Sequence, residues 1–280
     1  MRLTVQVVIE SDVGEREVIE EVVTLARGAL RIEELGLMIA EAKAMLQGVQ
    51  QVLVTHQAAE ARAAYAHCPD CGRRRGQKGQ HTLVVRTLFG KLQLPSPRLY
   101  HCPCRPRESR SCSPLADVLS ERTTPELAYL ESKFAALVSY GVTVELLADV
   151  LPLGGVINVA SLHRTLARVA TRMDAELGNE KGQFLDGSQR DWDALPPPGP
   201  PLTVGVDGGF VHAKDRPSRH EGRFEVIAGK SLPADDAGKV FAYVQNYDTK
   251  PKRRLFELLK SQGLQTNQQV TFLSDGADDV

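Results

Sequence analysis

The sequence lacks a long apolar run and a signal peptide. Nothing in its 280 residues approaches the roughly 20 apolar residues of a membrane span, and Met1 leads into RLTVQVVIE rather than a basic and then apolar leader. Cysteine is absent outside residues 68–112, which contain all five. These absences predict a cytoplasmic protein without a membrane segment. In that reducing compartment, clustered cysteines are more often metal ligands than disulfides.

An overall excess of charge is missing too, but the charges are unevenly spread. The formal net charge is −1 over the whole chain. Residues 68–112 carry a net +8, against −4 for residues 1–67, −5 for 113–200 and zero for 201–280. A compact basic segment in a nearly neutral chain predicts contact with a polyanion such as DNA. The length suffices for about two domains or more.

The first region, residues 1–67, begins with a strand-like alternation in RLTVQVVIES. From about Glu17 to Ala66, Leu, Ala, Glu and Lys dominate, and apolar residues recur three or four apart. This spacing predicts a strand followed by a helical region. We expect these helices to serve packing or self-association, which makes a homo-oligomer possible.

Residues 68–112 contain two cysteine pairs on either side of two strand-like runs. CPDCG stands at 68–72 and HCPC at 101–104, with HTLVVRTLFG and KLQLPSPRLY between them. Four thiolates from two turns suit tetrahedral zinc at about 2.3 Å, so the pattern predicts a structural zinc ribbon with Cys68, Cys71, Cys102 and Cys104 as ligands. The CxC spacing is less common than CxxC, so His101 or Cys112 could replace one ligand. Free or redox-active thiols are the alternative.

A basic turn, RRRGQKGQ, follows the first cysteine pair. We expect it to supply most of the non-specific DNA affinity through Arg73, Arg74, Arg75 and Lys78. The alternative is that these residues only keep a turn soluble.

Residues 113–195 have a helical pattern again. PELAYLESKFAALVSYG, TVELLADVLP and NVASLHRTLARVATRM predict three helices, with Pro152, Gly154 and Gly155 separating the last two. Their order is typical of a helix-turn-helix whose last helix enters a DNA major groove, although any small bundle has similar periods. The candidate contacts on that helix are Ser161, Arg164 and Arg168. His163 on the same helix could contact a base or could equally be a solvated helix residue.

The segment PPPGPP at 196–201 predicts a linker, and residues 202–280 a further domain. The pattern predicts strands at 202–213, 222–229 and 239–246, a helix at 251–262 and a strand at 269–274. Three meander strands, a crossover helix and a fourth strand parallel to the first describe the first half of a ribonuclease-H-like α/β fold. The whole chain is therefore expected to be an α+β multidomain protein.

Asp207 interrupts an otherwise apolar strand, LTVGVDGGFVHA, and Asp275 ends the last one. If these strands are parallel neighbours, the two carboxylates face each other and need a cation between them. Mg²⁺ or Mn²⁺ fits, because hard divalent ions take oxygen ligands and a pair of them can cleave phosphodiesters. Two glycines after Asp207 leave room for a nucleic-acid backbone.

CPDCG…RTLFGKLQLPSPRLYHCPC, the helical region, and VGVDGGFVHA…FLSDGA together resemble bacterial insertion-sequence transposases of the DDE type, most closely the ISKra family. The resemblance covers essentially the whole chain. It implies Mg²⁺-dependent cleavage at the element's ends and joining to target DNA, with Asp207 and Asp275 as the first two catalytic aspartates.

The family's third carboxylate, a glutamate on a later helix, has no counterpart in this sequence. Asp278 and Asp279 lie too near Asp275 to replace it. We therefore expect a truncated transposase with weak metal binding. The alternatives are a catalytically inactive zinc-containing DNA-binding fragment, a remnant without function, and a resolvase-type nuclease, against which the zinc ribbon argues.

Overall fold

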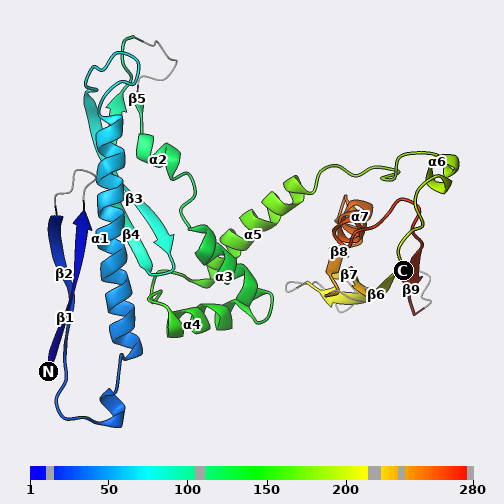
Figure 1. Cartoon of the computed structure of the whole chain (residues 1–280), viewed down its shortest axis with the longest axis horizontal. Coiled ribbons are helices and arrows are strands. Elements are labelled where there is room, and N and C mark those ends of the chain that lie inside the picture. Colours follow the sequence, from blue (N-terminus) through cyan, green and yellow to red (C-terminus); the bar gives the residue numbers. More distant parts are fainter. Residues whose placement is uncertain (11–15, 105–110, 214–221, 233–236, 276–280) are drawn as a thin grey trace. The chain divides into compact units, whose positions relative to one another are not determined.

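The computed structural model describes residues 1–10, 16–104, 111–213, 222–232 and 237–275. The chain divides into two compact units, Met1–Ala170 and Thr171–Val280. Within the described ranges there are seven α-helices and three β-sheets, so the predicted mixed α+β class is confirmed (Figure 1). None of the helices described is long and apolar enough to cross a membrane. Asp278 and Asp279 lie outside the described residues.

The N-terminal region begins with an antiparallel hairpin of β1 (Arg2–Glu10) and β2 (Arg16–Ala26). The prediction of helix from Glu17 onward was therefore wrong for the first part of that region. The β-branched residues Val22, Val23 and Thr24 favour an extended backbone. Val23 and Thr24 pair with Val5 and Thr4 of β1, and Val22 falls at a register shift of the ladder. A single 3-10 turn, η1 (Ile32–Glu34), leads to the long helix α1 (Ile39–Tyr65).

Helix α1 lies beside both hairpins of the first unit (Figure 1). On one side a Cβ at Gly48 would collide with the side chain of Val22, so the absence of a side chain permits the close approach of β2. On the other side α1 packs on the antiparallel pair β3 (Gln77–Thr87) and β4 (Gly90–Tyr100). Short elements β5 (Ser111–Cys112) and α2 (Pro114–Val118) complete this layer. The buried core residues are Ala58, Leu83, Val85, Leu92, Leu94 and Leu115.

Three helices follow, as predicted: α3 (Pro125–Ala135), α4 (Tyr140–Val150) and α5 (Val159–Glu176). Helix α3 ends earlier than expected, and Ser139 then caps α4 by accepting a hydrogen bond from the Val142 N–H. The helices enclose a core of Leu127, Leu147, Leu153 and Ile157. The boundary between the two units falls within α5.

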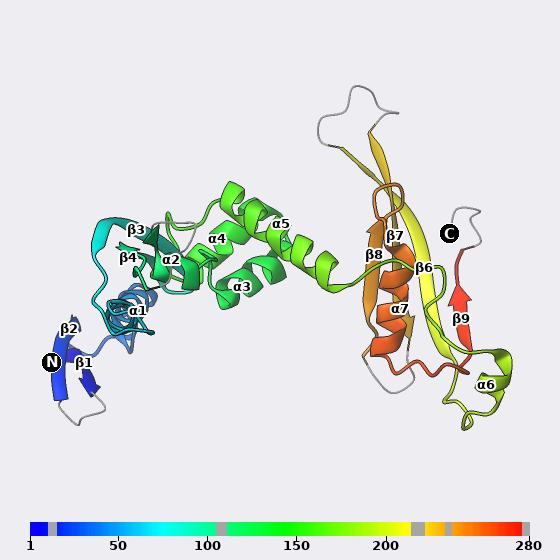
Figure 2. The same cartoon turned by 90° about the horizontal axis from the view of Figure 1, so that it is seen from above.

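The second unit contains a four-stranded sheet in the order β8-β7-β6-β9. Strands β6 (Leu202–His212), β7 (Arg223–Leu232) and β8 (Val240–Val244) form an antiparallel meander, and β9 (Val270–Leu273) pairs parallel with β6. This pairing confirms the predicted strand order. The crossover helix α7 (Pro251–Ser261) packs on one face through Leu258 and Leu259 (Figure 2). Pro251 begins α7, and Gly263, with φ +82°, follows its end.

The segment between α5 and β6, which includes the short helix α6 (Gln189–Asp193), is attached to this second unit. Phe184 stacks on Phe256 of α7 with ring centroids 4.9 Å apart. The predicted linker also makes contacts, because Gln268 donates a hydrogen bond to the Pro200 carbonyl at 2.6 Å. The proline-rich segment therefore lies against the loop before β9.

Candidate functional site

Four cysteines of the first unit form a cluster that could hold a metal ion. The Sγ atoms of Cys68, Cys71, Cys102 and Cys104 all lie within 4.8 Å of one another. The Cys68–Cys104 and Cys71–Cys102 Sγ distances are 3.5 and 3.3 Å. Tetrahedral zinc with Zn–S bonds of about 2.3 Å requires S···S distances of roughly 3.8 Å, so a small outward movement of the thiols makes room for the ion.

Two turns bring these cysteines together. In the first turn the Cys68 N–H donates to the Arg73 carbonyl and the Gly72 N–H to the Cys68 carbonyl, both at 2.9 Å. Gly72 has φ +69°, a left-handed conformation that a residue with a side chain adopts only at a cost. The second turn follows β4, whose last residue, Tyr100, donates its N–H to the Gly76 carbonyl at 2.8 Å. The β3–β4 pairing therefore determines the distance between the two cysteine pairs.

The thiols of this cluster do not lose their protons together. Hydrogen bonds from the backbone N–H groups of Asp70 and Cys71 lower the pKa of Cys68 to about 6. The hydrogen bond with Cys102, followed by that with Cys68, raises the pKa of Cys104 to about 12. The metal-free cluster thus holds one thiol readily as a thiolate and keeps the proton on another. A divalent metal would displace that proton, because thiolates are its ligands.

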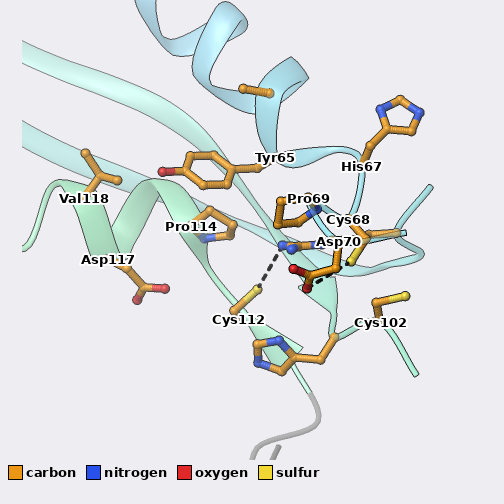
Figure 3. A pocket seen from close by; sticks show the side chains of 13 residues that line it. Tyr65, His67, Cys68, Pro69, Asp70, Cys102, Cys112, Pro114, Asp117 and Val118 are labelled. Carbon is orange, nitrogen blue, oxygen red and sulfur yellow. Dashed lines mark hydrogen bonds between the residues drawn. The ribbon is translucent and has the colours of Figure 1, made fainter. Parts of the chain in front are cut away.

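His101 and Cys112, the alternative ligands, do not join the cluster among the described residues. Both line a pocket of about 490 Å³ beside it, together with Tyr65, Asp117 and the half-buried Arg75 (Figure 3). The Arg75 Nη1 lies 4.0 Å from the Cys112 Sγ, and its buried Nε has no hydrogen-bond partner. Arg75 was predicted to contact DNA, but its side chain lines the pocket instead.

The other three predicted phosphate-binding residues of this turn, Arg73, Arg74 and Lys78, are exposed. The Lys78 Nζ lies 6.0 Å from the centre of the Tyr100 ring. Arg73 and Arg74 belong to the turn beside the cysteine cluster and Lys78 to the start of β3, and all three side chains are accessible to phosphates.

On α5 the structure separates the three predicted DNA contacts. Arg164 and Arg168 are exposed, whereas Ser161 is only 6% exposed. The Ser161 hydroxyl donates to the Asn158 carbonyl at 2.8 Å and accepts from the Asn158 N–H at 2.9 Å. This serine stabilises the first turn of α5, and of the three predicted contacts only Arg164 and Arg168 are exposed. His163 is exposed, with its ring centre 6.2 Å from that of Tyr140.

Sequence reasoning missed Glu131 on α3, which is 1% exposed. Burial raises the pKa of its carboxyl above the ordinary value, and this outweighs the Thr165 hydrogen bond and the charges of Arg86 and Arg168. One carboxyl oxygen has no hydrogen-bond partner. The available signal was its spacing, because it follows Leu127 by four residues on the apolar face of α3.

The two predicted catalytic aspartates line one cleft of about 860 Å³ in the second unit. The parallel pairing of β6 with β9 ends at Gly205 and Leu273, and Asp207 and Asp275 each follow two residues later. Both carboxylates therefore belong to the sheet face opposite α7. Asp207 is exposed although it interrupts an otherwise apolar strand, since no described element covers this face.

Lys230 of β7 also lines this cleft, and the sequence gave no reason to select it. It pairs with Gly205 across the β6–β7 ladder, so its side chain belongs to the same face as Asp207. An exposed ammonium group near two carboxylates could contact a phosphate that the carboxylates alone would repel.

Comparison with known proteins does not assign a family. No family model matches the sequence, and no curated protein matches it either.

Proposed function

We propose that this chain is a DNA-binding protein of the insertion-sequence DDE transposase type, similar to the ISKra family. Asp207 and Asp275 supply two of the acidic ligands for Mg²⁺ or Mn²⁺. The observation that supports this best is the parallel pairing of β6 with β9, which brings both carboxylates to one cleft. The strand order β8-β7-β6-β9 is also that of the first half of a ribonuclease-H-like fold.

The chemistry of the cleft agrees with this proposal. Two carboxylates on neighbouring strands repel each other unless a cation lies between them. Two divalent ions about 4 Å apart stabilise both the attacking and the leaving oxygen of a phosphodiester. The two aspartates make an incomplete set for that mechanism, which needs a further acidic ligand. Of the described residues that line the cleft, only Asp207 and Asp275 are acidic.

The first unit would hold the DNA. Structural zinc at Cys68, Cys71, Cys102 and Cys104 fixes the turn that carries Arg73 and Arg74 and the adjoining start of β3 that carries Lys78. Exposed Arg164 and Arg168 on α5 provide a second set of contacts, in the manner of a helix-turn-helix. Insertion-sequence ends and target DNA are the proposed ligands.

Metal titration tests the aspartate pair directly. Mn²⁺ binding, followed by electron paramagnetic resonance, should be weak in the unmodified chain and lost in Asp207→Asn and in Asp275→Asn. Asp149→Asn is the matched control, because Asp149 is exposed on α4 of the first unit. Unchanged Mn²⁺ binding in both cleft variants would exclude the proposed metal site.

A second candidate function is DNA binding without catalysis. The exposure of Asp207 and the absence of a third acid among the described cleft residues favour it. In that case the cleft variants would change neither Mn²⁺ binding nor DNA binding, whereas loss of the cysteine cluster would abolish DNA binding.

A further inference from the structure

Helix α1 exposes a stripe of large apolar side chains that nothing described covers. Ile39, Leu46 and Leu53 are 64%, 38% and 52% exposed. They stand seven residues apart, so they lie along one side of the helix with only a slow drift around it. The packed sides of α1 are different ones, since Gly48 lies against β2 and Ala58 in the core with β3 and β4.

The spacing of this stripe is that of a helix that pairs with another helix. Ala42 and Val49 follow Ile39 and Leu46 by three residues and are half-buried. Together the five residues repeat an apolar pattern of three and four, which is the seam of a two-helix coiled coil. We call this seam, Ile39, Ala42, Leu46, Val49 and Leu53, the α1 seam.

Apolar exposure continues from the α1 seam into the preceding loop. Leu30, Ile32, Leu35 and Leu37 are all more than half exposed. The three leucines of this set line an apolar pocket of about 460 Å³ at the end of the β1–β2 hairpin. Contiguous apolar surface of this kind marks a protein interface. A stable complex buries roughly 800 Å² on each partner, so the interface must extend beyond the α1 seam to these loop residues.

We propose that a second copy of this chain binds here, with the two α1 helices antiparallel and Leu46 near the two-fold axis. Helix α1 carries two acids and two bases, so a second copy meets no net repulsion. DNA is a poor occupant, because the α1 seam has no cation and the neighbouring Lys43 donates to the Ala148 carbonyl at 2.6 Å. The α1 seam shares no residue with the sets proposed to bind DNA or metal.

The exposed Glu60 determines the orientation of the two helices. It occupies the position seven residues after Leu53, so parallel helices would place the two Glu60 carboxylates opposite each other in the seam. Antiparallel helices centred on Leu46 instead place Ile39 opposite Leu53 of the second copy. This arrangement buries apolar residues against one another and keeps the two glutamates far apart. It is also self-complementary, as a two-fold interface must be.

Sedimentation equilibrium of the full chain tests the dimer. We expect a dimer at micromolar concentration and at least a roughly tenfold weaker association in Leu46→Gln/Leu53→Gln, about 1.4 kcal/mol. Leu137→Gln is the matched control, because Leu137 is 73% exposed between α3 and α4. Circular dichroism and zinc content verify that each variant is folded. A monomeric unmodified chain, or a double variant that associates normally, would overturn the proposal.

Cross-linking tests the orientation without disrupting the α1 seam. In a Cys112→Ser background, one cysteine is introduced as Leu46→Cys or Leu53→Cys, and a short bismaleimide is added. Antiparallel pairing brings the two Leu46 positions together but separates the two Leu53 positions by about 21 Å along the helix axis. We expect covalent dimers from Leu46→Cys only. Cross-linking of both variants, or of neither, would overturn the antiparallel arrangement.

Discussion

Asp207 and Asp275 occupy matching positions on two parallel strands. The β6–β9 ladder pairs Leu202 with Val270 and continues in step to Gly205 and Leu273. Asp207 and Asp275 each lie two residues beyond the end of this ladder. The relationship depends on this register, because a slip of one residue would move one carboxylate to the face that α7 covers. The same register leaves the pair without a third acid among the described residues of the cleft.

The cysteine cluster should contain about one zinc ion per chain. The β3–β4 hairpin brings the four thiols close enough to share one ion, and thiolates in two turns are typical ligands of structural zinc. Elemental analysis of protein purified without chelator measures this directly. Cys71→Ser should lower the zinc content and destabilise the first unit, whereas Cys112→Ser should change neither, since Cys112 lies outside the cluster. Less than a tenth of a zinc per chain, with all five thiols freely reactive, would contradict the assignment.

The exposed turn after the first cysteine pair should supply much of the non-specific DNA affinity. Each phosphate contact contributes roughly one unit to the slope of log K against log salt. We therefore expect Arg73→Ala/Arg74→Ala/Lys78→Ala to reduce the slope by about three units. Fluorescence anisotropy over a range of salt concentrations gives the value.

Arg75→Ala provides the control within the same turn. Its guanidinium lies in the pocket beside Cys112, so this change should leave the salt slope unaltered. Equal slopes for the triple variant and the unmodified chain would show that these cations do not contact phosphates.

The strand order and the cysteine cluster could be predicted from the sequence because local patterns determine them. Cys68 and Cys71 belong to one tight turn, so their spacing alone brings them together. In the second unit the first three strands are joined by short connections, and the crossover through α7 returns β9 parallel to β6. The β2 strand was missed because residues 16–26 contain glutamates at helical spacing, and only pairing with β1 decides their conformation. Tertiary contacts overrode the local pattern there.

Individual side chains were harder to predict. Arg75 stands among exposed basic residues in the sequence, yet the fold turns its side chain into a pocket. Ser161 has a hydroxyl of the kind that can contact DNA bases, but its hydrogen bonds to Asn158 stabilise the start of α5. The direction of such a side chain depends on the backbone conformation of a loop or a helix end. The apolar pattern and the charge of the segment do not reveal that conformation.

Glu131 should make the stability of the first unit depend on pH. Burial raises its pKa in the folded state, so folding favours the protonated carboxyl. This contribution is fully present below the unfolded pKa of about 4.3 and is lost as the pH rises through the folded pKa. Glu131→Gln keeps the shape without the charge, so its melting temperature relative to the unmodified chain should rise by a few °C between pH 4.5 and 8.

Glu126→Gln on the same helix is the control for this effect. Glu126 is exposed, so its replacement should leave the pH dependence of the melting temperature unchanged. A constant difference between Glu131→Gln and the unmodified chain across that pH range would contradict the role of burial at Glu131.

The 280-residue chain should neither cleave nor join DNA strands on its own. Asp207 and Asp275 line one cleft, and in the proposed function they hold one divalent ion. Two-ion chemistry needs a further acidic ligand to hold the second ion. Small displacements of reacting groups cost about 100-fold in rate, so a loosely held ion does not suffice. Incubation with Mg²⁺ or Mn²⁺ and a labelled insertion-sequence end should therefore leave the DNA intact while binding is still detected. Metal-dependent nicking that disappears in Asp207→Ala would show instead that the third ligand is already within this chain.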